Sequence, residues 1–168
     1  MVKYLLKITA VLENLTNLQP QGGFDDFDFV YLFKLKCEWC GEVSQKEIGV
    51  TLNVTNISHP IGKGKPNLAR KCKLCERIGT ITMIPDRGQP LTLETSESEK
   101  YVPLMLFDVS GYEPVDYVFG PSWRAESMKG TKFENIDLSS GKFAEYDEKG
   151  KCPRVVIYDL RSTFDVVY

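Results

Sequence analysis

The sequence contains no long apolar run and only one histidine in 168 residues. No stretch approaches the ~18 consecutive apolar residues that a membrane-spanning helix requires, so we expect no membrane segment. Residues 1–13 are largely apolar but include Lys3 and Lys7 and lack a cleavage site of small residues, which argues against a signal peptide. We therefore expect a cytoplasmic or nuclear protein, in a reducing compartment where thiols persist.

An excess of positive charge is also missing. The chain has 21 Lys and Arg against 23 Asp and Glu, a formal net charge of −2 and a pI of about 5.5. Proteins dedicated to nucleic acids are usually basic, so we do not expect DNA or RNA as the main partner. Hydrophobic residues make up 42% of the chain, which is enough for a globular core without disulfides.

Helical periodicity is absent as well, because no segment carries an apolar stripe over three helical turns. Residues 2–12 instead place apolar side chains at every second position: Val2, Tyr4, Leu6, Ile8, Ala10 and Leu12. This period-2 pattern, typical of strands, recurs in residues 29–37, 101–109 and 155–168. Pro103 suits an edge strand or a bulge, and residues 133–146 allow short strands or one helical turn. The patterns predict a mainly β protein.

Four of the five cysteines carry the clearest chemical signal. They form two Cys-x-x-Cys pairs, Cys37 with Cys40 and Cys72 with Cys75, separated by residues 41–71. Two intervening residues let both sulfurs of a pair face one point, and two such knuckles supply the four thiolates of a tetrahedral zinc site. Gly41 permits a left-handed turn that directs backbone N–H groups at sulfur. We predict one structural Zn²⁺ per chain, held by all four cysteines.

Other uses of the cysteines stay open at this point. A redox pair would require Cys-x-x-Cys at a helix start in a βαβ setting, which the sequence lacks. An iron–sulfur cluster or Cu(I) would also suit four thiolates. Four protein ligands leave no metal position for water, so zinc hydrolysis is not expected. Cys152 lies outside the set, and we expect it to be a free thiol.

No acid–base pair is evident from the sequence. The single histidine, His59, lies in a loop rich in proline and glycine, where we expect it to be solvated. Carboxylates occur at several positions that nothing in the sequence brings together: Glu113, Asp116, Asp147 and Glu148. We therefore expect that the protein is not an enzyme.

Basic residues surround the cysteines in sequence: Lys36, Arg70, Lys71, Lys73 and Arg77. Their charge favours the thiolate form and offsets the net negative charge of Zn²⁺ with four thiolates. The alternative is a binding patch for phosphate, or for RNA along residues 63–77. Trp39 and Trp123 could each be exposed for a partner, although packing is the commoner use of such rings.

A short internal similarity suggests a repeat. Residues 15–20 (LTNLQP) and 109–114 (VSGYEP) each follow a predicted strand and share the order apolar, hydroxyl, turn former, apolar, Gln or Glu, Pro. The alternative is that unrelated strand-to-turn exits look alike. With the repeat, we predict two related β-sandwich-like lobes packed together. Residues 1–89 would form the zinc-binding lobe and residues 90–168 the second lobe, unless the chain is one continuous domain.

Five segments together resemble the eukaryotic CXXC-motif-containing zinc-binding protein family: LENLTNLQP at 12–20, CEWCGE at 37–42, KCKLC at 71–75, EPVD at 113–116 and YDEK at 146–149. Cys-x-x-Cys alone is common, but these segments span most of the chain in this order. The resemblance implies an all-β, two-lobed fold and one zinc held by the four cysteines. It implies no settled biochemical activity. Residues 22–28 and 62–67 depart from the pattern.

These observations favour a monomeric, zinc-stabilised module that binds a protein partner not identified by the sequence. The alternative hypothesis is the handling of zinc, copper or thiols together with a partner protein. The two differ in whether the metal stays in place, since a structural site is closed and stable, whereas a handling site must be exposed and exchangeable.

Overall fold

The computed structural model describes residues 1–53, 66–147 and 152–168, with the backbone alone at residues 152 and 153. No helix in these ranges is long and apolar enough to cross a membrane. The described elements, in chain order, are β1 Val2–Glu13, β2 Leu15–Pro20, β3 Tyr31–Cys37, β4 Ile48–Val50, β5 Leu68–Lys71, β6 Ile78–Ile84, α1 Leu93–Glu97, β7 Val102–Ser110, β8 Tyr112–Val118, β9 Trp123–Ser127, β10 Lys132–Ile136, β11 Phe143–Asp147 and β12 Cys152–Val167.

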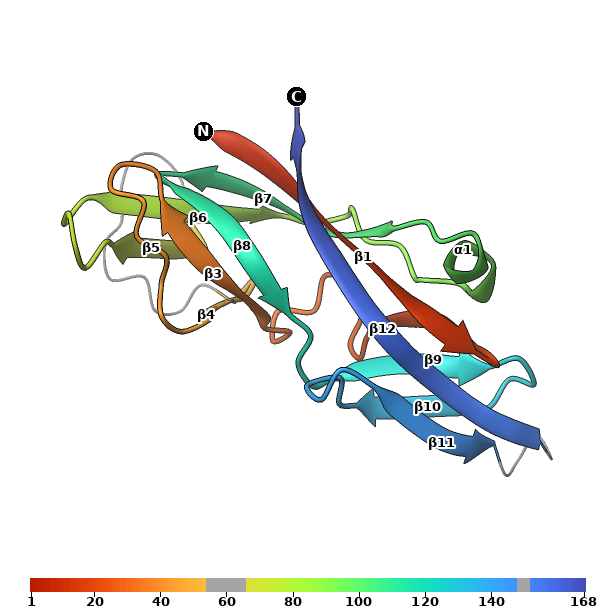
Figure 1. The fold of residues 1–168 in the computed structure, drawn as a ribbon. Coiled ribbons are helices and arrows are strands. Elements are labelled where there is room, and N and C mark those ends of the chain that lie inside the picture. The colour runs from red at the N-terminus through yellow and green to blue at the C-terminus, as the bar shows by residue number, and fades with distance from the viewer. Residues whose placement is uncertain (54–65, 148–151) are drawn as a thin grey trace.

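The strands form three antiparallel sheets. A six-stranded sheet has the order β11-β12-β1-β7-β6-β5, and two three-stranded sheets have the orders β10-β9-β2 and β4-β3-β8. Figure 1 shows the long strands β1 and β12 crossing the molecule, with β3, β4 and β5 at one end and β9, β10 and β11 at the other. The predicted mainly-β class with two related lobes is confirmed.

The strand order repeats itself within the chain. Exchanging each strand with the one six places away (β1 with β7, β2 with β8, and so on) converts the β4-β3-β8 sheet into the β10-β9-β2 sheet and leaves the six-stranded order unchanged. The halves are intertwined, because β2 joins β9 and β10 while β8 joins β3 and β4. The predicted division between residues 89 and 90 falls between β6 and β7. That these halves are separate domains stays a prediction.

A single left-handed residue makes the turn at equivalent places in the two halves. Asn14, with φ 57°, links β1 to β2, and Gly111, with φ 84°, links β7 to β8. Asn and Gly tolerate this conformation better than other residues. The repeat suggested by residues 15–20 and 109–114 is therefore present in the topology, but its alignment differs. Leu15 directly follows the turn residue Asn14, as Tyr112 directly follows the turn residue Gly111. Leu15 therefore corresponds to Tyr112 and not to Val109.

The predicted alternation of β1 decides which side chains reach the core. Tyr4 and Leu12 mark the ends of its fully buried face, and Val2 packs against the core from the rim. β7 lies between β1 and β6, so Pro103 occupies a central strand and not an edge. The register with β1 shifts between Leu6 and Lys7, where Lys7 pairs with Pro103. The alternative of a bulge at Pro103 is thus confirmed.

Aromatic rings join the sheets across the core. The ring of Phe33 on β3 lies 5.2 Å from that of Phe107 on β7 and 5.3 Å from that of Phe164 on β12, both edge-on. Trp123 is fully buried, with its ring 5.4 Å from that of Phe29. Trp123 is therefore a core residue, whereas Trp39 is 46% exposed. α1 lies in residues 91–100, for which no element was predicted, and residues 133–146 hold the short strands β10 and β11.

Candidate metal centre

The first knuckle is formed at the end of β3, which terminates at Cys37. Gly41 donates its N–H to the carbonyl of Cys37 at 2.9 Å, and Cys37 donates its N–H to the carbonyl of Glu42 at 2.8 Å. Gly41 adopts the left-handed conformation, with φ 78°. This closed turn brings Cys40 back toward Cys37, as the sequence predicts.

The second knuckle repeats the same backbone pattern after β5. Glu76 donates its N–H to the carbonyl of Cys72 at 3.0 Å, and Cys72 donates its N–H to the carbonyl of Arg77 at 2.8 Å. Glu76 also has a positive φ, of 66°. A side chain with a Cβ is strained in this region by about 1–2 kcal/mol, so the knuckle geometry is retained here at an energetic cost.

The four cysteine sulfurs converge on one point between the knuckles. All four Sγ atoms lie within 4.8 Å of one another. Two close contacts join the knuckles, with Cys37 Sγ 3.7 Å from Cys75 Sγ and Cys40 Sγ 3.6 Å from Cys72 Sγ. A zinc ion with Zn–S bonds of about 2.3 Å has S–S separations of about 3.8 Å in a tetrahedron. The donor set therefore fits zinc in both chemistry and spacing.

The cluster is buried on one side and open on the other. Cys37 and Cys72 are 1% and 4% exposed and belong to the hydrophobic core. Cys40 is exposed, and Cys75 is partly exposed. A metal here would tie the core ends of β3 and β5 together while two of its ligands face solvent.

Without a metal, the four thiols cannot all ionise, because thiolates this close repel one another. Burial acts to raise the pKa of Cys37, but backbone N–H groups of Cys40 and Trp39 and the nearby thiols lower that pKa to about 7. The backbone N–H of Glu42 acts to lower the pKa of Cys40, but burial and the other thiols raise it to about 12. A cation that binds thiolates is what allows the full set to be deprotonated.

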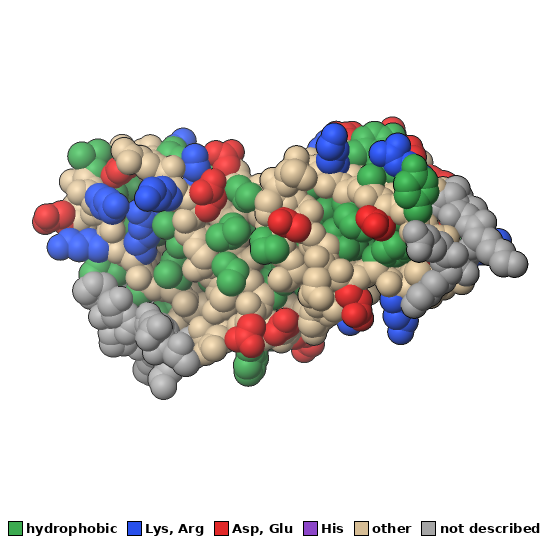
Figure 2. Space-filling view, turned by 90° about the horizontal axis from the view of Figure 1, so that it is seen from below, with side chains coloured by type: hydrophobic (Ala, Val, Ile, Leu, Met, Phe, Trp, Pro, Cys, Tyr) green, Lys and Arg blue, Asp and Glu red, His purple; other side chains and the backbone are tan. Residues whose placement is uncertain are grey.

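Charged side chains crowd the same end of the molecule, where Figure 2 shows several Lys and Arg side chains together. Four of the predicted basic residues are exposed: Lys36, Lys71, Lys73 and Arg77. The fifth, Arg70, is half-buried. The guanidinium of Arg77 lies 5.1 Å from the centre of the Trp39 ring. One acidic group enters the site, since Glu42 Oε2 is 3.5 Å from Cys72 Sγ.

The ring of Trp39 packs against Gly111, the turn residue that precedes β8. A Cβ at Gly111 would lie 2.7 Å from the edge of the Trp39 ring, so only glycine fits there. Glu38 donates its N–H to the carbonyl of Gly111 at 3.1 Å. Cys37 itself lies opposite Tyr112 in the β3–β8 pairing. The metal centre is therefore joined to the start of β8 through both the backbone and the tryptophan.

The second lobe has a counterpart of this site that the sequence did not reveal. In β9, Ser127 takes the place of Cys37: Gly130 donates its N–H to Ser127 O at 2.9 Å, as Gly41 does to Cys37. At the next position, Met128 donates its N–H to the carbonyl of the turn residue Asn14 at 3.1 Å, as Glu38 donates its N–H to the carbonyl of Gly111. In the repeat, the β11–β12 pair corresponds to the β5–β6 pair. Asp147 at the end of β11 therefore lies at the position equivalent to the second knuckle, which follows β5.

Side-chain hydrogen bonds occupy the place in the second lobe that the cysteine cluster occupies in the first. Ser127 and Asp147 are 4% and 2% exposed. Thr131 donates its hydroxyl to Asp147 Oδ1 at 2.6 Å, and Ser127 Oγ accepts the backbone N–H of Thr131 at 3.0 Å. We call Ser127, Thr131 and Asp147 the polar clasp. The sequence signal that could have revealed the polar clasp is Gly130, a glycine at the position equivalent to Gly41. Like Gly41, it has a positive φ, of 92°.

The other predicted side chains do not join the cysteines. Glu113 and Asp116 lie on β8, whereas Asp147 ends β11 in the other lobe. His59 and Glu148 lie outside the described residues, as does Lys63 at the start of the predicted RNA-binding segment. Cys152 begins β12, and its side chain is not among those described.

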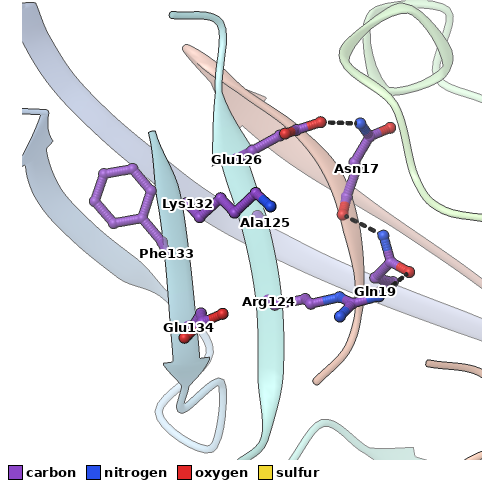
Figure 3. Close-up of a pocket in the computed structure, with 8 residues that line it drawn as sticks. All are labelled: Asn17, Gln19, Arg124, Ala125, Glu126, Lys132, Phe133 and Glu134. Atoms are coloured by element: carbon purple, nitrogen blue, oxygen red, sulfur yellow. Dashed lines mark hydrogen bonds between the residues drawn. The ribbon is translucent and has the colours of Figure 1, made fainter. Parts of the chain in front are cut away.

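A separate hollow of about 250 Å³ lies on the outer face of the β10-β9-β2 sheet. Figure 3 shows that the polar side chains contributed by β2 and β9 bind one another: Arg124 donates to Gln19 Oε1 at 3.1 Å, and Asn17 donates to a carboxylate oxygen of Glu126. A pocket built for catalysis would direct polar groups at a ligand, so this hollow has the character of a cross-strand side-chain network.

Comparison with known proteins identifies relatives along the full chain. The model of the family described as "CXXC motif containing zinc binding protein, eukaryotic" matches residues 5–165. A protein of that name from Xenopus laevis is 37% identical over 165 residues, 98% of each chain. A protein of the same name from Homo sapiens is 34% identical over 165 residues, again 98% of each chain.

Solved structures share the fold. The crystal structure of C1orf123 superposes with a TM-score of 0.85 and 32% identity, covering 98% of this chain and 99% of that one. A hypothetical protein from Plasmodium falciparum superposes with a TM-score of 0.78 and 20% identity, covering 98% of this chain and 100% of that one. The second likeness concerns the fold alone.

Proposed function

The chain belongs to the eukaryotic family of CXXC-motif-containing zinc-binding proteins, and we propose that it is a zinc-stabilised protein-interaction module without catalytic activity. The resemblance drawn from the sequence is thereby confirmed. One observation carries the proposal: four cysteine sulfurs lie within 4.8 Å of one another, at the spacing of a closed four-ligand zinc site. Such a site leaves no position for water or substrate on the metal.

The proposed role of zinc is to hold β3 and β5 together. Cys37, Cys40, Cys72 and Cys75 would bind one Zn²⁺, which is the chemistry of structural sites that contribute directly to folding. Because Cys37 and Cys72 are buried in the core, loss of the metal leaves close, buried thiols with no cation. The polar clasp performs the equivalent connection in the other lobe without a metal.

A protein partner is proposed because the end of the molecule that carries the four cysteines, which we call the zinc end, leaves apolar side chains partly exposed to solvent. Trp39 is 46% and Leu74 68% exposed, and each lies between the two cysteines of its knuckle. Exposed apolar patches mark interaction sites, and Trp and Arg are enriched in protein contact surfaces. The chain would act as a monomer that presents this surface.

The metal part of the proposal is tested by replacing one buried ligand from each knuckle. Cys37→Ser and Cys72→Ser should each lose zinc, measured by metal analysis of the purified protein, and should show a large fall in melting temperature. Unchanged zinc content and unchanged folding in both variants would contradict a structural site.

The interaction part is tested by affinity capture with the zinc-loaded protein. A protein retained by wild type but lost with Trp39→Ala would place the contact at the zinc end. Tyr146→Ala is the matched control, because Tyr146 is 69% exposed in the other lobe. If wild type enriches nothing over the bare matrix under conditions that preserve zinc, the interaction role is wrong.

The exposure of Cys40 favours one alternative, in which the site exchanges zinc or Cu(I) with a partner protein. A ligand that faces solvent offers an entry point for a competing thiol. Release of zinc to a mild chelator within minutes, with the fold intact by circular dichroism, would support exchange. Retention for hours would support the structural role instead.

A further inference from the structure

The outer edges of β2 and β8 are related by the internal repeat, yet their surroundings differ. On β2, Leu18 and Leu91 exchange two backbone hydrogen bonds: Leu18 N–H donates to Leu91 O at 2.9 Å, and Leu91 N–H donates to Leu18 O at 3.0 Å. Among the described residues, β8 has no strand or bridge on the edge that faces away from β3. The place that Leu91 fills on one edge is thus open on the other.

Both edges carry features that usually discourage pairing. Each contains a β-bulge with a left-handed residue, Asn17 at φ 57° in β2 and Asp116 at φ 54° in β8. Each also contains a proline, Pro20 or Pro114. Bulges and prolines protect exposed edges against indiscriminate association. Because β2 binds Leu91 beside its bulge despite them, the same features do not prevent a strand from adding to β8.

A groove of about 410 Å³ runs along the open edge of β8. Its lining comes from two strands: Pro114, Val115, Asp116 and Tyr117 of β8, and Ser162, Thr163 and Phe164 of β12. β11 pairs with β12 only as far as Ile157, so within the described ranges the part of β12 that lines the groove has no paired strand on that side. Figure 1 shows β8 and β12 on the same side of the molecule.

The charge of the groove indicates what would fill it. Asp116 is the one charged residue of the lining. It is exposed, and its carboxylate has no ion pair or hydrogen bond among the described residues. The neighbouring Asp165 is already bound by Lys7 at 3.1 Å and by the Thr163 hydroxyl at 2.9 Å. The remaining lining is apolar or hydroxyl, so a segment with aliphatic side chains and one basic side chain complements it.

We propose that the open edge of β8 binds an extended segment of a partner protein as an added β-strand, with a Lys or Arg of that segment at Asp116. Backbone hydrogen bonds supply affinity in this mode, and alternate side chains supply specificity. The inference rests on the proposed interaction role and names its surface and the class of partner. β8 begins at Tyr112, opposite Cys37, so the added strand would start beside the zinc end.

The probe is a hexapeptide of alternating Val and Lys, acetylated and amidated at its ends, added to the zinc-loaded, isotope-labelled full chain. We expect NMR shift changes in the amides of residues 115–118 and 162–164, and slower hydrogen exchange on β8. Two comparison peptides separate the causes. The same peptide N-methylated at alternate amides should lose binding by tenfold or more, because it cannot form the ladder. A Val and Glu version should bind more weakly than the Val and Lys version.

Matched variants locate the charge. Asp116→Asn keeps a residue that tolerates positive φ and should weaken binding about two- to fivefold, as expected for one exposed charge pair. Asp159→Asn is the control, because Asp159 is the left-handed residue of the β12 bulge, at φ 52°, and does not line the groove. Its affinity should equal that of wild type.

Three results would overturn the inference: no perturbation of β8 at millimolar peptide, perturbation confined to another edge, or equal binding of the N-methylated peptide. The affinity capture described above stays independent of these results. A partner lost with Trp39→Ala while the peptide leaves β8 untouched would retain the interaction role and reject this surface. Failure of capture together with a positive peptide result would reject only the cellular role.

Discussion

Glu76 adopts the same left-handed backbone conformation after Cys75 that Gly41 adopts after Cys40, with φ of 66° and 78°. Both residues donate the N–H that closes a knuckle onto its first cysteine. The second knuckle therefore has the geometry that the first achieves with glycine, although its sequence lacks the glycine. A residue that pays no Cβ penalty should improve it.

We expect Glu76→Gly to raise the free energy of unfolding of the zinc-loaded protein by about 1 kcal/mol, because the left-handed strain is relieved. Gly41→Ala should lower it by a similar amount. A Cβ at Gly41 meets no atom within 4 Å, so its effect would come from the backbone alone. Denaturant titration at constant zinc measures both, and a destabilised Glu76→Gly would show that its carboxylate contributes more than the strain costs.

Metal binding should release protons and weaken on acidification. The pKa values of Cys40 and Cys75 are raised in the metal-free cluster, the first to about 12, so both thiols are protonated at neutral pH and must lose those protons to bind metal. Cys37, with its pKa lowered to about 7, adds a third proton to the exchange as the pH falls below 7. Calorimetry in buffers of different ionisation enthalpy should show the release of at least about two protons at pH 7. A zinc affinity independent of pH between 6 and 8 would contradict this description of the thiols.

Breaking the polar clasp should destabilise the fold without changing its metal content. Thr131→Val removes the hydroxyl that donates to the buried Asp147 at 2.6 Å. A typical intramolecular hydrogen bond contributes about 0.5–1.5 kcal/mol, so the melting temperature should fall by a few degrees while bound zinc stays at the wild-type level. Thr163→Val is the control, because the Thr163 hydroxyl binds the more exposed Asp165. Equal stability of the two variants would show that the clasp does not connect the second lobe.

Gly79→Ala should perturb the metal end more than its small size suggests. A Cβ at Gly79 would lie 2.5 Å from the carbonyl oxygen of Ser110 and 2.4 Å from the Tyr112 ring. Relief requires a shift of β6 against β7, at about 1–3 kcal/mol, next to the second knuckle. Gly120→Ala is the matched control, since its nearest contact is an ordinary 3.4 Å to Leu32. The two variants are compared by melting temperature and by zinc content. Equal values for both would mean that the sheet accommodates a Cβ at Gly79 without loss of stability.

The first strand and the knuckles could be predicted because their signals are local. Every second residue from Tyr4 to Leu12 is apolar and buried, and this period of two is that of a half-buried strand. Cys37 and Cys40 need only two intervening residues and a turn to face one point. The short strands β8 and β9 were missed for the opposite reason. Their strongest feature, the buried Trp123, shows its place only once Phe29 and Phe119 pack beside it.

By itself, the sequence determined the β class, the identity of the four candidate ligands and the family, since these depend on residue type and spacing along the chain. The tertiary structure alone decided that Cys37 lies against Cys75 and Cys40 against Cys72, and that Ser127 and Asp147 occupy the equivalent place in the second lobe. It also decided that the edge of β2 is covered by Leu91 while that of β8 has no paired neighbour in the part of the chain that the structure describes. Each of these depends on which strands exchange between the halves and in what register, and hydrogen-bond ladders between distant strands leave no periodic trace in the sequence.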